Sequence, residues 1–369
     1  MKDNKTLLYD LLEFVSANNY PDIHISTNHK PIFRNESGEI ITLASINIKG
    51  EEKKLHILNK SDIVEIILVL LGRERYGNFL DDFESDTSFR VEGGERFRVN
   101  CYSDNEGFSI AMRLIPSKVP TMEDLGLGAQ IKNICNKSKG LFIMTGPTGV
   151  GKSTNLAAMI DYINKNFKKH IITIEDPIEF IFKSDKSLIN QREVGTNTES
   201  FSKALKASMR EDPDVIMIGE MRDPETIKTA LTLAETGHLV FSTLHTNDCP
   251  QTIDRIVDIF PENKQKQVRM QLAMSLLGIM SQRLLPKKGV EGRIAAREIL
   301  ITNDAIKNMI IEGKTHQIYS VIEVGIKEGM ILMDKYLITL YEKGLIDIDI
   351  LFSYVRDKEA AKMLINNNK

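Results

Sequence analysis

Residues 146–153 read Gly-Pro-Thr-Gly-Val-Gly-Lys-Ser, and this stretch decides the fold. It fits the pattern G-x-x-x-x-G-K-[S/T], in which a glycine-rich turn wraps backbone N–H groups around phosphate oxygens. The apolar run 141–144 precedes the turn and the helical stretch 155–163 follows it, which is the strand–loop–helix order that such a site requires. The pattern predicts a phosphate-binding loop.

The loop has the chemistry of a nucleoside triphosphate site. The ammonium of Lys152 reaches outer phosphates, and the hydroxyl of Ser153 suits Mg²⁺. We therefore predict ATP and Mg²⁺ as ligands. The candidate binding residues are Gly146, Pro147, Thr148, Gly149, Val150, Gly151, Lys152, Ser153 and Thr154. A glycine-rich loop without function is the alternative, and the strand–helix context argues against it.

Short apolar runs around this loop predict an α/β fold. The runs 141–144, 171–174, 215–218 and 239–241 alternate with helical stretches. Strands that are apolar on both faces are typical of a parallel sheet covered by helices. Downstream, Asp223 and Pro224 mark the start of a helix.

The flanking segments have a different pattern. Residues 1–115 predict a small mixed domain, with a helix that Ser61 caps and that continues to Leu71, with Gly72 just past its end. Two prolines stiffen a linker at 116–125. The ATPase domain then spans 126–300, and 301–369 forms a helical extension whose apolar stripe indicates packing.

Acidic residues follow two of the predicted strands. Glu220 comes after the run 215–218, at the sheet edge where parallel sheets bind ligands, so it could support catalysis and Mg²⁺ together with Ser153. Glu175, Asp176 and Glu179 follow the run 171–174, and an acid there could polarise an attacking water. Exposed surface glutamates remain the alternative for both sets.

Histidines and arginines complete the candidate residues. His245 follows the last predicted strand and could sense a phosphate. His238 and His245 flank that strand at an odd spacing that would place them on opposite faces, so a shared metal is not expected. Arg96 and Arg113 lie on predicted strands of the small domain and could clamp phosphate charge across a subunit interface. A structural histidine and a solvated basic face are the alternatives.

Composition limits the other classes of function. Hydrophobic residues make up 42% and charged residues 27%, with a net charge of −3, which argues against nucleic acid as a partner. The three cysteines, Cys101, Cys135 and Cys249, are too widely spaced for a zinc site or a disulfide framework and suggest reduced cytosolic thiols. No apolar run is long enough to insert into a membrane.

Taken in order, these motifs resemble the secretion ATPase superfamily of type II secretion and type IV pili, and within it the PilT family of twitching-motility retraction ATPases. The segment 174–180, Ile-Glu-Asp-Pro-Ile-Glu-Phe, is similar to the family's aspartate box. Residues 210–223 resemble its Walker B region, although Gly219 replaces the usual aspartate. Residues 234–246 resemble its histidine box. The resemblance covers nearly the whole chain.

The resemblance implies a PAS-like N-terminal domain, a RecA-like ATPase domain and a homohexamer with ATP at the subunit interfaces. It implies that Glu179 is the general base, that Glu220 is needed for hydrolysis and that arginines of the small domain reach the nucleotide. It also implies an inner-membrane pilus platform protein as partner. The expected location is cytoplasmic, peripheral at the inner face of the cell membrane.

The direction of pilus movement is a finer question. Extension ATPases usually carry a longer N-terminal region and a four-cysteine zinc site, so this sequence resembles the retraction family more. The family's Ala-Ile-Arg-Asn-Leu-Ile-Arg-Glu segment corresponds to 305–312, where Lys307 and Ile311 replace the two arginines. The alternatives are an extension or type II secretion ATPase, a DNA-translocating motor and a non-hydrolysing nucleotide switch.

Overall fold

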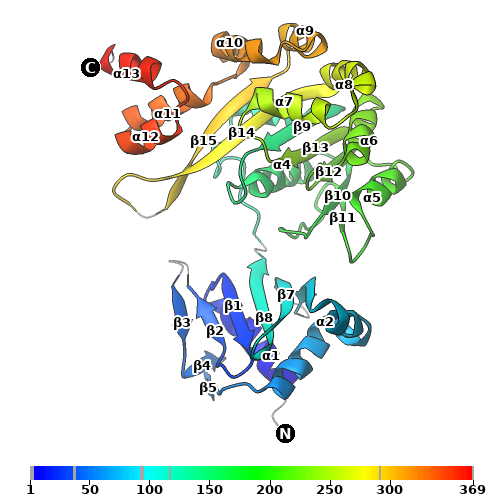
Figure 1. The fold of residues 1–369 in the computed structure, drawn as a ribbon, viewed down its shortest axis with the longest axis vertical. Coiled ribbons are helices and arrows are strands. Elements are labelled where there is room, and N and C mark those ends of the chain that lie inside the picture. Colours follow the sequence, from blue (N-terminus) through cyan, green and yellow to red (C-terminus); the bar gives the residue numbers. More distant parts are fainter. Residues whose placement is uncertain (1–3, 36–38, 92–94, 116–117, 291, 368–369) are drawn as a thin grey trace. The chain divides into compact units, whose positions relative to one another are not determined.

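The computed structural model describes residues 4–35, 39–91, 95–115, 118–290 and 292–367. The chain divides into two compact units, residues 1–118 with 179–181 and residues 119–178 with 182–369. The predicted linker begins at residues 116 and 117, which lie outside the described residues. Figure 1 shows the elements of each unit.

The smaller unit is built on an antiparallel sheet in the order β3-β2-β1-β8-β7-β6. Its strands are β1 (Asp22–Ser26), β2 (Ile32–Arg34), β3 (Ile40–Thr42), β6 (Glu84–Arg90), β7 (Arg96–Asp104) and β8 (Gly107–Ile115). A separate hairpin joins β4 (Ser45–Ile48) to β5 (Glu51–Lys54). This unit is therefore a small α+β domain rich in strands.

Two helices supply the rest of this unit's core. In α1 (Asn4–Ala17), Leu8, Leu11, Leu12 and Val15 are buried, which is the spacing of one helix face. The second helix, α2 (Lys60–Asp82), is capped by Asn59, which forms a capping box with Asp62, so the prediction that Ser61 caps this helix is wrong.

The predicted end of α2 was only partly right. Gly72 leaves the helical conformation with φ 73° and ψ 170°, as expected of a residue beyond a helix end. The chain then resumes a helix to Asp82. The glycine therefore interrupts the helix without ending it.

The larger unit contains a seven-stranded sheet in the order β11-β10-β12-β13-β9-β14-β15. The strands are β9 (Gly140–Thr145), β10 (His170–Glu175), β11 (Leu188–Glu193), β12 (Val215–Ile218), β13 (Leu239–Leu244), β14 (Leu276–Pro286) and β15 (Arg293–Ile301). Neighbouring strands are parallel except for β15, which pairs antiparallel with β14. The predicted parallel sheet thus has an antiparallel edge.

Helices cover both faces of this sheet (Figure 1). One core contains residues of α5 (Phe201–Ser208), α6 (Pro224–Glu235), α7 (Cys249–Asp258), α8 (Glu262–Ser275), α9 (Asp304–Glu312) and α10 (Ile318–Val324). The other contains residues of α3 (Ala129–Cys135) and α4 (Lys152–Asn166).

The central strands are buried along their whole length, which explains their unbroken apolar runs. Every residue of β9, β12 and β13 is buried. Burying one Leu, Ile or Phe side chain stabilises a fold by about 1.5–3 kcal/mol. The predicted helix start is also confirmed, because Asp223 accepts a hydrogen bond from the N–H of Thr226 at 2.9 Å.

The C-terminal segment after β15 is helical, as predicted. Its last helices, α11 (Met333–Glu342), α12 (Ile348–Tyr354) and α13 (Lys358–Asn367), enclose a separate core with Leu285 and Ala296 of β14 and β15. Met333, Leu337 and Leu340 are buried in that core. The apolar stripe of α11 is therefore a packing face. Short 3-10 turns at Thr315–Gln317 and Gly325–Glu328 flank α10.

The three cysteines are unpaired and buried. Burial raises the pKa of the Cys101 and Cys135 thiols to about 12. These two thiols therefore stay protonated near neutral pH and are inert.

In the described part of the chain, no helix combines the length and the apolar character needed to cross a bilayer.

Candidate active site

The phosphate loop lies between the end of β9 and the start of α4. Helix α4 begins at Lys152, and its N-cap is Gly151, which has no side chain that could accept hydrogen bonds from the first turn. Ser153 and Thr154 are half-buried in that turn. The positive end of the helix dipole and the backbone N–H groups of its first turn thus face the loop, as an anion site requires.

Two positions of the loop are occupied by glycine for different structural reasons. Gly146 has φ 138°, and a β-carbon there would lie 2.4 Å from the carbonyl oxygen of Gln282, a backbone atom that cannot rotate away. Gly149 has φ 78°, and a β-carbon there would meet no atom within 4 Å. The loop is therefore tightly seated on β14 at its start and open at its middle.

Lys152 is buried, and its ammonium stays inside the loop. The Nζ atom donates to the carbonyl oxygens of Gly146 at 2.8 Å and Pro147 at 3.0 Å. It also lies 3.5 Å from Nδ1 of His245. The loop backbone therefore holds the cation where the phosphate oxygens of a nucleotide would arrive.

His245 joins this lysine to Glu220. The Nε2 atom of His245 lies 3.2 Å from a carboxylate oxygen of Glu220, and the other oxygen of Glu220 forms an ion pair with Arg222. The Glu220 side chain is 13% exposed, whereas that of His245 is 46% exposed. Residues from β12, β13 and α4 thus converge at one edge of the sheet.

Gly219 lies directly after β12, at the position where the resemblance leads us to expect an aspartate. Its N–H donates to the carbonyl of Ile174 at 2.8 Å, and a β-carbon there would lie 3.4 Å from backbone atoms of Ile174 and Glu175, which is an ordinary van der Waals distance. The space around Gly219 therefore does not require glycine. Glu220 is the predicted acid after β12, and it is linked to Lys152 of the phosphate loop through His245.

A buried polar network, which no local sequence pattern indicates, lies behind the loop. Gln282 donates to the carbonyl of Val150 at 2.5 Å, and its Oε1 accepts from Arg297 at 2.8 Å and Asn155 at 3.2 Å. Asn155 also donates to the carbonyl of Gly151 at 2.6 Å. Because these side chains are nearly fully buried, each bond fixes the loop from behind.

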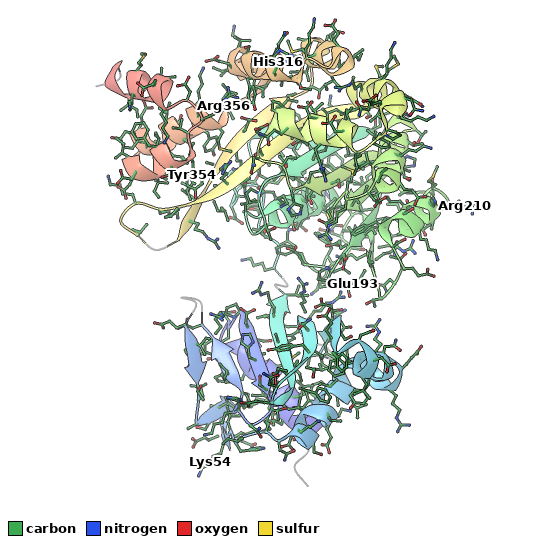
Figure 2. The ribbon with its side chains drawn as sticks, viewed as in Figure 1. Lys54, Glu193, Arg210, His316, Tyr354 and Arg356 are labelled. Carbon is green, nitrogen blue, oxygen red and sulfur yellow. The ribbon has the colours of Figure 1, made fainter. Side chains whose placement is uncertain are left out.

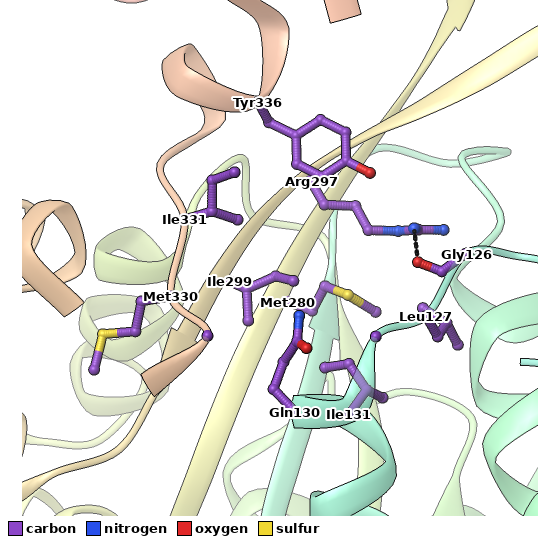
Figure 3. Close-up of a pocket in the computed structure, with 12 residues that line it drawn as sticks. Gly126, Leu127, Gln130, Ile131, Met280, Arg297, Ile299, Met330, Ile331 and Tyr336 are labelled. Carbon is purple, nitrogen blue, oxygen red and sulfur yellow. Dashed lines mark hydrogen bonds between the residues drawn. The ribbon is translucent and has the colours of Figure 1, made fainter. Parts of the chain in front are cut away.

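Arg297 extends this network to the segment before α3. Its guanidinium donates to the carbonyl of Leu125 at 2.7 Å and to that of Gly126 at 3.2 Å, and the second bond is drawn in Figure 3. Burial lowers the pKa of Arg297 from its usual value, while Tyr336 acts in the opposite direction. A cavity of about 300 Å³ lies beside it, lined mainly by Met280, Ile299 and residues of α3 and the 329–336 segment.

The loop after β10 carries the other predicted acids. Glu175 is buried and accepts hydrogen bonds from Thr173 at 2.6 Å and Gln191 at 3.2 Å. Glu179 is exposed. The residue before it is fixed, because the N–H of Ile178 donates at 3.0 Å to Glu193, a buried carboxylate labelled in Figure 2.

The predicted arginines lie on neighbouring strands of the smaller unit. Arg96 on β7 donates to Ser88 at 2.5 Å, and Arg113 on β8 binds Asp22 through two bonds of 2.6 and 3.3 Å. Arg98 pairs in register with Arg113 and is exposed. The three therefore share one region of a sheet.

His238 lies away from the site. It precedes β13, where its Nδ1 lies 3.0 Å from the carbonyl of Leu233, and His245 follows the same strand. Six strand residues separate the two histidines by roughly 20 Å. They do not share a metal, although the reason is their position at opposite ends of the strand rather than on opposite faces.

The donors at this edge fit a nucleoside triphosphate. A helix N-terminus, a buried lysine and an open glycine turn supply positive potential for phosphates. Ser153 and Glu220 are the oxygen donors near the loop that Mg²⁺ prefers, beside phosphate oxygens. Among the described residues, no group of three or more His, Cys, Asp or Glu side chains is placed to hold a metal ion.

The sequence gives only a partial signal for the buried residues behind the loop, which are Asn155, Gln282 and Arg297. Asn155 is a polar residue in an otherwise apolar helical run, which is a visible signal. Gln282 and Arg297 lie on β14 and β15, which the sequence reading did not identify as strands. The polar run 281–283 interrupts the apolar pattern of β14 and conceals it.

Known proteins are similar to this chain in both sequence and fold. The family described as type II/IV secretion system protein matches residues 85–331. The type IV pilus retraction ATPase PilT of Pseudomonas aeruginosa is 45% identical over 91% of this chain and 94% of its own length. A twitching motility protein of Neisseria gonorrhoeae is 45% identical over 82% of this chain and 81% of its own. A crystal structure of the pilus retraction motor PilT with bound ADP superposes with a TM-score of 0.84, at 41% identity and 98% coverage of both chains.

Proposed function

Because this chain belongs to the type II/IV secretion system protein family, we infer that it is a pilus retraction motor. The chain is an ATPase, as its relatives are, and it binds a nucleotide. The observation that carries this function is the convergence of Lys152, His245 and Glu220 on the phosphate loop, in a chain related over nearly its full length to retraction ATPases.

We propose that the phosphate loop, residues 146–154, binds ATP. Lys152 exchanges its loop carbonyls for outer phosphate oxygens, because a phosphate is the stronger acceptor for an ammonium. Ser153 and Glu220 hold Mg²⁺, which would neutralise phosphate charge when bound. The buried bonds of Gln282 and Asn155 keep the loop in shape without the nucleotide.

In the hydrolysis step that we propose, Glu179 accepts a proton from the attacking water. The water oxygen bonds to the γ-phosphorus as the bond to the β–γ bridging oxygen breaks, giving ADP and phosphate. Glu220 keeps His245 oriented, and His245 senses whether the γ-phosphate is present. Arg96 and Arg113 stabilise the charge that develops on the phosphate.

The assembly that fits these roles is a homohexamer in which arginines of the small unit act at a neighbouring nucleotide. Hydrolysis would change how the two units of each protomer are arranged. We propose that this rotation acts on an inner-membrane pilus platform protein, with the motor at the cytoplasmic face of the cell membrane. Neither nucleic acid nor membrane insertion has a part in this proposal.

The first experiment is phosphate release from purified protein with Mg-ATP over a range of protein concentrations, beside Lys152→Ala. We expect turnover per protomer to rise with concentration, because the site is completed between protomers, and to vanish in the variant. Concentration-independent turnover would remove the interface from the mechanism. No turnover in the wild-type protein would favour a nucleotide switch.

A second experiment tests the direction of movement. Deletion of a retraction motor is expected to leave cells with excess pili, whereas deletion of an extension or secretion ATPase would leave them without pili. Electron microscopy of the deletion strain distinguishes the two. Loss of pili would replace retraction with the alternative assembly function.

A further inference from the structure

A buried carboxylate that the hydrolysis steps do not use joins two helix starts. Glu298 on β15 is 3% exposed. One of its oxygens accepts the N–H of Cys249 at 2.9 Å, and the other accepts the N–H of Met333 at 3.4 Å. Cys249 is the first residue of α7, and Met333 is the first residue of α11. A single side chain therefore satisfies the N-termini of two helices.

The first of these helices carries the loop that contains His245. Cys249 lies four residues after His245, and each residue between them is tied down. Thr246 lies 2.6 Å from the hydroxyl of Thr145, the carbonyl of Asn247 accepts from Ser281 at 2.8 Å, and Asp248 caps α7. The hydroxyl of Thr246 also lies 2.7 Å from that of Thr252 in α7, so a shift of the first turns of α7 would be passed to the residue that follows His245.

The second helix anchors the C-terminal helices. Met333 is buried in their core, and Asp334 accepts the N–H groups of Arg356 at 2.9 Å and Asp357 at 3.0 Å. Arg356, labelled in Figure 2, also lies 3.8 Å from the ring centre of Tyr319. The position of α11 thus determines that of α12 and α13.

A buried carboxylate is costly for a fold unless its hydrogen bonds compensate. Burial raises the pKa of Glu298 above its usual value, and the Cys249 and Met333 N–H groups act in the opposite direction. An apolar residue on β15 would pack at no such cost but would leave both N–H groups unsatisfied. The arrangement points to a use for the linkage between the two helices.

We propose that Glu298 is a positioning residue for hydrolysis, which holds the first turn of α7 so that His245 faces Glu220 and Lys152 and links this loop to the C-terminal helices. The inference rests on the proposed ATPase function. The hydrogen bonds of the Glu298 carboxylate go to the starts of α7 and α11 and not to the phosphate loop, so it acts through α7.

The test is Glu298→Gln, which keeps the size of the side chain but replaces one acceptor oxygen with a donor. We expect kcat to fall about tenfold, the loss that one misplaced hydrogen bond produces, while the affinity for ADP changes less than about twofold. Asp334→Asn is the matched control, because Asp334 in α11 also accepts two backbone N–H groups, those of Arg356 and Asp357, and neither belongs to α7. An unchanged kcat, or an equal loss of ADP affinity, would overturn the proposal.

A double-mutant cycle with His245→Gln tests whether Glu298 affects hydrolysis through His245. If Glu298 acts through His245, adding Glu298→Gln to His245→Gln produces little further loss of kcat. Independent, additive losses would contradict it. Glu298→Asp, which keeps the charge on a shorter side chain, serves if the glutamine variant does not fold, with an intermediate loss expected.

A measurement without turnover separates this inference from the proposed function. In NMR spectra of histidine-labelled protein, Glu298→Gln should move the His245 ring signal and leave that of His238, at the other end of β13, unchanged. Both signals unchanged would refute the positioning role even if the wild-type protein hydrolyses ATP. A moved His245 signal would support the role even if turnover requires a partner.

Discussion

The two sides of the candidate site lie at one edge of the same sheet but are built differently. The binding side, which is the phosphate loop with Asn155, Gln282 and Arg297, is fixed from behind by side chains that are at most 4% exposed. On the side proposed for hydrolysis, which is His245 with Glu220, the His245 side chain is 46% exposed, and Arg222 next to Glu220 is 75% exposed.

This difference separates two tasks. Binding phosphates requires a loop that is already in shape, because any ordering on binding would reduce affinity. Organising a water requires groups that a neighbouring element can complete, and such groups must remain accessible. A motor of this kind can therefore bind its nucleotide with one rigid side and control hydrolysis with the other.

The largest effect should come from Lys152→Ala, which removes the ammonium held inside the phosphate loop. We expect turnover to fall about a thousandfold, with nucleotide affinity falling as well, because this buried cation lies where the outer phosphate oxygens would bind. Phosphate release and ADP titration measure both. Lys165→Ala on the same helix, whose lysine pairs with Asp161 at the surface, is the control and should behave as wild type.

Glu220→Gln should separate the two sides. We expect kcat to fall about a hundredfold while the affinity for ADP is retained, since the carboxylate contacts His245 and not the loop. Steady-state kinetics beside ADP titration measures the split. A parallel loss of affinity would mean that Glu220 belongs to the binding side and that the comparison is wrong.

Arg297→Leu should weaken the binding side through stability. The change leaves the carbonyls of Leu125 and Gly126 without their donor, which costs about 2 kcal/mol of unfolding free energy. Chemical unfolding measures it. Arg283→Leu, a neighbouring arginine whose guanidinium lies 5.5 Å from the ring of Tyr354, should cost less than about 1 kcal/mol. Equal losses of unfolding free energy in the two variants would show that the buried network stabilises the fold no more than the Arg283–Tyr354 contact does.

The smallest effect is expected from Arg222→Gln. Its ion pair with Glu220 is exposed on the arginine side, so stability should change by less than about 1 kcal/mol. In the isolated protein, kcat should change less than about threefold. Initial-rate measurements at low protein concentration check this. A loss as large as that of Glu220→Gln would move Arg222 into the hydrolytic machinery.

The structural elements that could be predicted from the sequence are those whose signal lies within a few neighbouring residues. The phosphate loop has its own residue pattern, and β9, β12 and β13 are apolar on both faces because helices cover both. Asp223 followed by Pro224 marked a helix start that the structure confirms. In each case neighbouring residues carry the information.

The parts that could not be predicted depend on residues far apart in the chain. Gln282 reaches the carbonyl of Val150 across 132 positions, and Glu298 joins Cys249 to Met333. No neighbouring residue in the sequence indicates that Gln282 bonds to a loop carbonyl. A glutamate in an apolar stretch is as consistent with a surface position as with a junction between two helices. Such contacts follow from topology, which local patterns do not contain.

The seat of Gly146 against β14 has a consequence for how the motif evolves. The carbonyl of Gln282 would exclude a side chain at Gly146 whether or not a nucleotide is ever bound. A descendant that had lost its catalytic activity would therefore still need this glycine for its fold. Among divergent copies of this gene, loss of the first glycine would indicate a change in how the loop packs on β14, and not only a loss of activity.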